Sequence, residues 1–254
     1  MGFKFASLGS GSSGNATLIT HEETHILVDC GFSVKEAQRR IERLGLCLSQ
    51  VSAVVVTHEH GDHLKGVPAL ARKHKMPVYM TPGTYHSRDL GLIPDLHFIQ
   101  NYAAFQVGDV VIQPVAVTHD AREPAQYIFR HKQQSLGVLT DLGSVTTHVL
   151  DAFDGCQALL VEANHDPSML ANGPYPPSLK SRVASPWGHL SNEQTAALLQ
   201  QMDTSQLQHL VIGHISRKNN SLDLARRALS TVKKPLGDIT YACQDEGFDW
   251  IELN

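Results

Sequence analysis

The sequence lacks the features that mark secreted and membrane proteins. It begins Met1-Gly2-Phe3-Lys4 and runs directly into a strand-like segment, without the apolar stretch or the small-residue cleavage site of a signal peptide. No apolar run approaches the roughly 18 residues that a membrane-spanning helix needs. The sequence therefore predicts a cytoplasmic protein that does not enter a membrane.

Cysteine is scarce, and its placement argues against two kinds of stabilised site. The four cysteines lie far apart and form no CxxC pair: Cys30, Cys47, Cys156 and Cys243. Such spacing disfavours both a disulfide framework and a thiolate zinc site. We expect ordinary reduced thiols.

The composition contains no biased segment that would indicate disorder. Hydrophobic residues make up 42% and charged residues 18% of the 254 residues, which is typical of a soluble globular protein. This length suffices for a substantial core, so the sequence predicts one domain spanning residues 1–254.

The formal net charge of -4 argues weakly against a nucleic-acid partner, but the charge is uneven. The segment from Ser178 to Lys234 has eight basic and three acidic residues, a net charge of +5, which leaves -9 for the rest. A basic face is one interpretation of this surplus, and solvated helix faces without a partner are the other.

Residues able to bind a metal are most concentrated in the stretch from Thr57 to His63. It follows the apolar run Val51–Val56 and holds four residues able to bind a metal: His58, His60, Asp62 and His63. Four ligands in so short a loop can hardly all bind one tetrahedral ion. The stretch therefore predicts two metal ions, with further ligands from elsewhere in the chain.

Three polar residues that follow predicted strands are the candidates for those further ligands. His119 follows the strand predicted for 110–117, Asp141 the strand at 136–140, and His214 the strand at 207–212. Each alone is typical of a hydrogen-bonded turn, but a carboxylate such as Asp141 can bridge two ions. Imidazole and carboxylate donors suit zinc and also admit manganese, so we expect two divalent ions per chain, Zn²⁺ or Mn²⁺.

Other polar residues are candidates for catalysis and for substrate contacts. Asp62 is a candidate acceptor of a proton from water, while His165 and His189 are candidates for binding a phosphate or protonating a leaving oxygen. For both histidines the alternative is orientation of a metal ligand. The glycine-rich loop 9–14 offers backbone N–H groups to a phosphate, although a tight hairpin explains it too. The predicted substrate contacts are Ser10, Ser12, Asn15, Lys180, Arg182, Arg217 and Lys218.

The stretch His58-Glu59-His60-Gly61-Asp62-His63, together with His119, Asp141 and His214, resembles the ligand series of the metallo-β-lactamase fold hydrolases. The resemblance covers essentially the whole chain. It implies an α/β fold, a four-layer αββα sandwich in which two mixed β-sheets are flanked by helices. It also implies that His58, His60 and His119 hold one ion, that Asp62, His63 and His214 hold the other, and that Asp141 bridges them.

Further segments resemble the YycJ/WalJ-type subgroup of this family. They are Leu8–Asn15, Glu162–Asp166, Gly188–Glu193 and Gly213–Ser216 followed by Asn219-Asn220. The resemblance implies a metal-dependent 5′ to 3′ DNA exonuclease that hydrolyses a phosphodiester with a metal-activated water. It implies DNA rather than RNA as the substrate, and no obligate protein partner is evident.

Two other functions remain open at this point. A small-molecule hydrolase of the same fold would act on a lactone, a thioester or a cyclic phosphodiester, and it would need a closed apolar pocket. A non-catalytic binding module would keep the fold without the reaction. Residues 142–213 are too few for the inserted domain of ribonuclease J, and the long arm of transfer-RNA 3′-processing enzymes is not evident.

Overall fold

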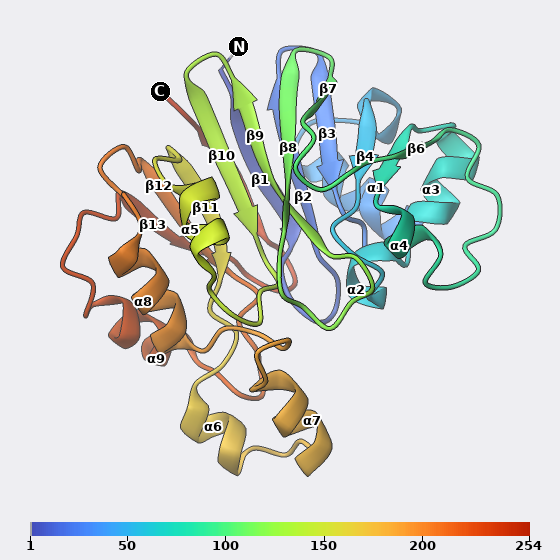
Figure 1. The fold of residues 1–254 in the computed structure, drawn as a ribbon. Helices are drawn as coiled ribbons and strands as arrows, with labels where there is room; N and C mark the ends of the chain where they lie inside the picture. The colour runs from blue at the N-terminus through green and yellow to red at the C-terminus, as the bar shows by residue number, and fades with distance from the viewer. Residues whose placement is uncertain (1) are drawn as a thin grey trace. The chain divides into compact units, whose positions relative to one another are not determined.

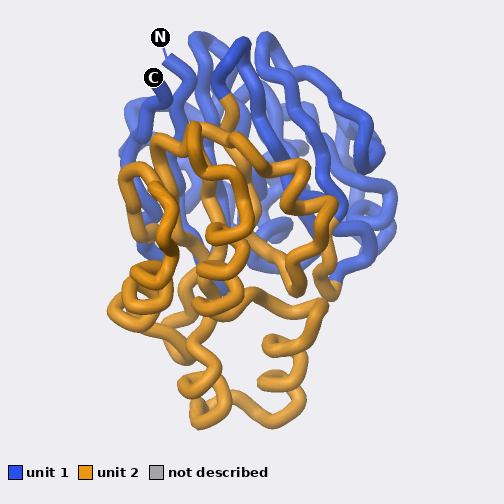
Figure 2. Tube along the Cα trace, turned by 60° about the vertical axis from the view of Figure 1, so that its left-hand side comes forward, with its two compact units in different colours: residues 1–116, 121–134, 243–254 blue, residues 117–120, 135–242 orange. Residues whose placement is uncertain are grey.

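The computed structural model describes residues 2–254, and within them the strands belong to two seven-stranded sheets of mixed strand direction. The chain divides into two compact units, coloured separately in Figure 2. Unit 1 comprises residues 1–116, 121–134 and 243–254, and unit 2 comprises residues 117–120 and 135–242. Among the described residues, no helix combines the length and apolar character needed to cross a membrane.

Unit 1 contains a complete sheet in which one half is antiparallel and the other half is parallel (Figure 1). Its order is β14 (Phe248–Glu252), β1 (Lys4–Gly9), β2 (Ala16–His21), β3 (Thr24–Val28), β4 (Ala53–Val55), β5 (Val78–Met80) and β6 (Leu96–Phe98). The strands from β14 to β3 pair antiparallel, and those from β3 to β6 pair parallel. The carboxyl ends of β3 and β4 therefore share one edge, where Asp29 and Thr57 lie.

Helices α1 (Val34–Arg43) and α3 (Val67–His74) pack on this sheet through apolar faces that include Ala37, Ile41 and Leu70. Ser33 caps α1 by accepting a hydrogen bond from the Glu36 N–H at 3.3 Å. A short helix, α2 (Gly61–Leu64), lies directly ahead of α3. The break falls at Gly66, where a Cβ atom would lie 2.0 Å from the Phe32 carbonyl oxygen.

The remaining elements of unit 1 are a 3₁₀ turn, a short helix and three antiparallel strands. The 3₁₀ turn η1 (Leu48–Gln50) follows α1, and helix α4 (Pro82–Tyr85) follows β5. Strands β7 (Phe105–Val107), β8 (Val110–Ala116) and β9 (Ala125–His131) form an antiparallel ladder. The buried Tyr127 hydroxyl donates to the Val56 carbonyl at 2.5 Å, and the Ala125 N–H donates to the Thr57 carbonyl at 2.9 Å. These bonds fix the backbone that leads into the histidine-rich stretch.

Unit 2 contains four parallel strands, β10 (Gln134–Leu139), β11 (Ala158–Glu162), β12 (His209–Gly213) and β13 (Asp238–Tyr241). Its helices are α5 (Thr147–Phe153), α6 (Pro167–Asn172), α7 (Pro177–Val183), α8 (Asn192–Gln201) and α9 (Leu222–Leu229), of which α8 and α9 lie side by side (Figure 1). Since the strands are parallel, Asp141, Glu162 and His214 lie at the same edge.

Candidate functional site

The loop after β4 presents two pairs of metal-binding atoms within unit 1. His58 Nε2 lies 3.0 Å from His60 Nδ1, and His63 Nε2 lies 3.6 Å from Asp62 Oδ2. Ligand bonds of 2.0–2.1 Å at tetrahedral angles separate two donor atoms by about 3.4 Å. Each pair therefore has the spacing of two ligands on one ion.

Asp29, at the end of β3, orients both buried histidines of this loop. Its Oδ2 accepts from His63 Nδ1 at 2.8 Å and from the Thr57 hydroxyl at 2.7 Å. The Thr57 oxygen in turn accepts from His58 Nδ1 at 2.9 Å. With both Nδ1 atoms protonated, Nε2 is the nitrogen of His58 and of His63 that has the character of a metal ligand.

Asp29 is itself buried, and burial raises the pKa of its carboxyl. The His63 imidazole and hydrogen bonds from Thr57 act against this shift, one of them from the Thr57 N–H to Asp29 Oδ1 at 2.8 Å. The backbone of Asp29 has a φ of 61°, in the left-handed region that few residues other than glycine adopt. The buried Asp29 carboxylate, held on this strained backbone, therefore fixes the positions of the His63 and Thr57 side chains.

Asn15, predicted as a substrate contact, lies buried against the same loop. Its Nδ2 lies 3.2 Å from Asp62 Oδ2 and 3.0 Å from His63 Nε2, and its N–H donates to the Asp62 carbonyl at 2.7 Å. Its Oδ1 accepts from the Gly11 N–H at 2.7 Å, which closes the glycine-rich loop. In that loop Ser12 is exposed, whereas Ser10 is buried.

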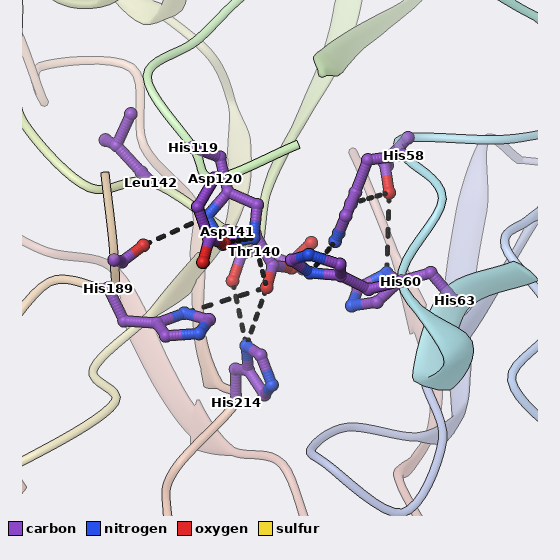
Figure 3. Close-up of polar contacts among 12 residues, drawn as sticks. His58, His60, His63, His119, Asp120, Thr140, Asp141, Leu142, His189 and His214 are labelled. Atoms are coloured by element: carbon purple, nitrogen blue, oxygen red, sulfur yellow. Dashed lines mark hydrogen bonds and ion pairs between the residues drawn. The ribbon is translucent and has the colours of Figure 1, made fainter. Parts of the chain in front are cut away.

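In unit 2, two histidines are held with one ring nitrogen turned to a backbone carbonyl (Figure 3). His119 Nδ1 donates to the Gly188 carbonyl at 2.9 Å, and His214 Nδ1 donates to the Thr140 carbonyl at 3.1 Å. A carbonyl only accepts, so both Nδ1 atoms carry a proton, and in the neutral ring Nε2 is the nitrogen that can bind an ion. Asp141 Oδ1 lies 3.3 Å from His214 Nδ1 and 3.9 Å from His119 Nε2.

Glu162 and His189 form a buried carboxylate–imidazole pair beside Asp141. His189 Nδ1 donates to Glu162 Oε2 at 2.9 Å, and the Leu142 N–H donates to Oε1 at 2.6 Å. Burial raises the pKa of Glu162, and the nearby His189 acts against this shift. His189 Nδ1 lies 3.6 Å from Asp141 Oδ1, and Figure 3 shows its ring turned toward Asp141.

His165 lies at the start of the segment that leads to α6. Burial lowers its pKa to about 4, so the ring is neutral at pH 7. Within residues 2–254 its buried Nδ1 has no hydrogen-bond partner, while its carbonyl accepts from the Asn192 N–H at 2.9 Å. It is a neutral imidazole with one nitrogen unused.

The predicted basic contacts all lie in unit 2, and three of them have defined partners. Lys180 donates to the Ala171 carbonyl, Arg182 pairs with Asp120, and the Lys218 ammonium lies 5.9 Å from the centre of the Tyr175 ring. Arg217 is exposed on the loop after His214. These cations lie on α7 and on the loop after β12.

Another group of metal-binding residues lies elsewhere in unit 1, where the sequence gave no motif. His21 and His131 stack with ring centroids 3.6 Å apart, and both approach Asp109. Stacked rings direct their nitrogen lone pairs side by side rather than toward one point, so this group fits an ion poorly. A substitution in this group therefore serves as a control for substitutions of the candidate metal ligands.

Sequence reasoning did not assign a role to Asp29 or Glu162. Each carboxylate lies at the carboxyl end of a buried strand, which is the same signal that identified Asp141. The imidazoles that they contact are not adjacent in sequence. Only the three-dimensional structure therefore shows that Asp29 contacts His63 and that Glu162 contacts His189.

The donor atoms of both units fit divalent ions. Imidazole Nε2 atoms with fixed tautomers and buried carboxylates are ligands of zinc and also of manganese. The carboxylate–histidine contact of Asp29 is typical of the hydrogen bonds that surround metal ligands. The residues therefore support divalent-metal binding.

Comparison with known proteins identifies relatives over nearly the whole chain. Residues 24–215 match the model of the β-lactamase superfamily domain. The chain is 37% identical over 241 residues to the exodeoxyribonuclease YycJ of Bacillus anthracis, covering 93% of this chain and 91% of that protein. It is 34% identical over 235 residues to the exodeoxyribonuclease WalJ of Streptococcus pneumoniae, covering 90% and 87%.

A solved structure, the metallo-β-lactamase fold protein YhfI of Bacillus subtilis, superimposes with a TM-score of 0.76 at 14% identity, covering 98% of both chains. This match confirms the predicted fold class of two mixed sheets flanked by helices. The family match and the two exodeoxyribonuclease relatives confirm the resemblance seen in the sequence. The chain belongs to the metallo-β-lactamase superfamily and, within it, to the group of the YycJ and WalJ proteins.

Proposed function

We propose that this protein is a metal-dependent phosphodiester hydrolase that degrades DNA as a 5′ to 3′ exonuclease. The observation that carries the proposal is its similarity to two exodeoxyribonucleases over about nine tenths of their length. The oriented imidazoles and carboxylates of both units support it. Such donors fit hydrolysis at a metal site and are not needed by the fold alone.

Seven residues from both units would hold two divalent ions. They are His58, His60, Asp62 and His63 of unit 1, and His119, Asp141 and His214 of unit 2. The two ligand pairs after β4 support two ions rather than one. When bound, the ions supply activation of water and neutralisation of charge on the phosphate oxygens.

The chain's own residues would move the protons. Asp62 would accept the proton of the attacking water. The Nδ1–H group of His189 would donate its hydrogen bond to Glu162, which orients the ring so that Nε2 would deliver a proton to the leaving oxygen. Neutral His165 would contact a phosphate oxygen through a ring N–H.

The substrate contacts would come from two places. Ser10, Ser12 and Asn15 belong to the glycine-rich loop of unit 1, where backbone N–H groups can approach a phosphate. Lys180, Arg182, Arg217 and Lys218 belong to the basic segment of unit 2, and phosphate contacts of this kind position nucleic acid without reading its sequence.

Digestion of single-stranded DNA labelled at its 5′ end tests the proposal. The wild-type enzyme with Zn²⁺ or Mn²⁺ should release the label first as a short product, whereas Asp141→Ala should be at least about 100-fold slower. Asp109→Ala is the matched control, since it removes a carboxylate from the other His–Asp group and should digest like the wild type. Equal digestion by the wild type and Asp141→Ala, or none by either, contradicts the proposal.

A further inference from the structure

Trp187 is an exposed indole whose surroundings do not explain its position. The chain has two tryptophans, and Trp250 is half-buried with its indole N–H donating to the Leu44 carbonyl at 3.0 Å. Trp187, by contrast, is 58% exposed. Exposing so large an apolar ring to water is unfavourable, and such side chains often mark binding surfaces.

The backbone beneath this indole is held against the candidate ligands of unit 2. The next residue, Gly188, provides the carbonyl that accepts from His119 Nδ1, and His189 of the carboxylate–imidazole pair follows it. A Cβ atom on Gly143 would lie 2.5 Å from the Trp187 Cα, so the turn packs directly on the loop that follows Asp141. The backbone that carries the indole is therefore held in place by packing, and Trp187 lies two residues before His189.

The same turn is fixed on its other side by α7. A Cβ atom on Gly188 would lie 2.3 Å from the Arg182 carbonyl oxygen and 2.2 Å from the Val183 carbonyl oxygen. The Arg182 side chain is exposed and pairs with Asp120, the neighbour of His119. The backbone next to the indole thus packs against the backbone of Arg182, whose guanidinium pairs with the neighbour of His119.

An aromatic face beside a cation is the combination that binds single-stranded nucleic acid, because each base stacks on the ring while its phosphate meets the charge. We propose that Trp187 is the stacking platform for the unpaired nucleobase next to the cleaved phosphate. This inference rests on the proposed nuclease function and adds a preference for single-stranded or frayed ends. A base inside a duplex is already stacked on both faces and cannot use the indole.

A cycle of two enzymes and two substrates tests the stacking. Trp187→Ala should lower kcat/KM about tenfold on an intact single strand. In a second set of substrates, one base is missing at the first, second or third nucleotide from the 5′ end. At one of these positions the wild type and Trp187→Ala should have equal kcat/KM. Trp187→Phe should retain most of the activity, and Trp187→Leu, which keeps apolar bulk without an aromatic face, should not.

Fluorescence gives a second readout that does not depend on turnover. In a Trp250→Phe variant stripped of metal, a single strand should quench the remaining tryptophan, and the strand lacking the stacked base should quench it less. Trp187→Phe, which keeps Trp250, should show little change.

Three results overturn the proposal. One is a Trp187→Ala defect of the same size on every abasic strand as on the intact strand. Another is full activity of Trp187→Leu. The third is a Trp187→Ala variant whose molecular mass by light scattering differs from that of the wild type and whose defect in kcat/KM does not depend on any base. This result would assign the indole to a contact between copies of the chain. If the wild type digests DNA in these cases, the proposed function stands without the platform. A wild type that digests no DNA refutes the function itself.

Discussion

At the scale of single residues, Asp29 connects the two histidines that the sequence pattern places five positions apart. It contacts His63 directly and His58 through the Thr57 hydroxyl, so one carboxylate sets the tautomer of both rings. Contacts of this kind raise the basicity of the ligand nitrogen and restrict the ring to one orientation. Loss of Asp29 should therefore affect an ion that it does not touch.

We expect Asp29→Asn to bind metal about 10–100-fold more weakly than the wild type, because an amide is a poorer acceptor and carries no charge. Competition with a chromophoric chelator measures this affinity. Glu59→Gln is a matched control, since its carboxylate lies in the same loop but accepts from the Arg122 N–H rather than from a histidine. Equal affinity of Asp29→Asn and the wild type would contradict the role given to Asp29.

His165 makes stability depend on pH. Burial lowers its folded-state pKa to about 4 from the ordinary value of 6.5, so between these values the unfolded chain binds the extra proton. Stability from this residue is therefore complete above about pH 6.5 and is lost as the pH falls toward 4. The wild type should lose about 1–2 kcal/mol more than His165→Gln between pH 7 and pH 5.

Urea unfolding of metal-stripped protein at both pH values checks this, because bound metal would add its own pH dependence. The comparison with His165→Gln removes the contributions of the other histidines. Parallel pH profiles of the two proteins would show that the ring is not held neutral by burial.

The candidate metal ligands stand out in the sequence, while the residues that orient them do not. His58, His60, Asp62 and His63 lie so close together that no ordinary turn accounts for them. Asp29 and Glu162 are single carboxylates at strand ends, and only the fold brings them to an imidazole.

At the scale of elements, helix α8 begins where the loop carrying His189 ends. Ser191 accepts from the Gln194 N–H at 3.2 Å, and the Ser191 N–H donates to Gln194 Oε1 at 2.8 Å. This capping box satisfies backbone groups that would otherwise be unpaired. The cap therefore fixes the position at which the His189 loop joins the helix.

Ser191→Ala should lower the free energy of unfolding by about 1 kcal/mol and also lower kcat, because the loop to His189 loses its anchor. Ser221→Ala is the matched control. Ser221 caps α9 by accepting from the Leu224 N–H at 3.3 Å, and its loss should cost similar stability without changing kcat. Denaturant unfolding and initial rates measure both. Equal kcat for the two variants would show that the cap serves stability alone.

Strands were easier to predict than short helices. Strands β8 (Val110–Ala116) and β10 (Gln134–Leu139) cover most of the ranges 110–117 and 136–140 expected from their apolar residues. Helices α6 and α7 were not predicted, because Pro167 and Pro177 are typical of turns. Here proline occupies the first helical position, where the missing N–H has no partner to lose.

At the scale of the whole molecule, the proposed metal ligands are divided between the two units. Unit 1 contributes the loop after β4, and unit 2 contributes residues at the ends of its parallel strands. The basic surplus of residues 178–234 falls entirely within unit 2. That surplus favours a nucleic-acid substrate over a small uncharged one, and a phosphate-based contact should weaken as salt increases. The single domain predicted for residues 1–254 stays a prediction.

Reconstitution of metal-stripped enzyme tests the central claim most directly. The protein is titrated with Zn²⁺ or Mn²⁺ while the ions bound per chain and the rate of hydrolysis of 5′-labelled single-stranded DNA are measured together. We predict saturation at two ions per chain, with full activity reached only as the second ion binds. Saturation below one ion per chain, or full activity before a second ion binds, would contradict a two-metal nuclease.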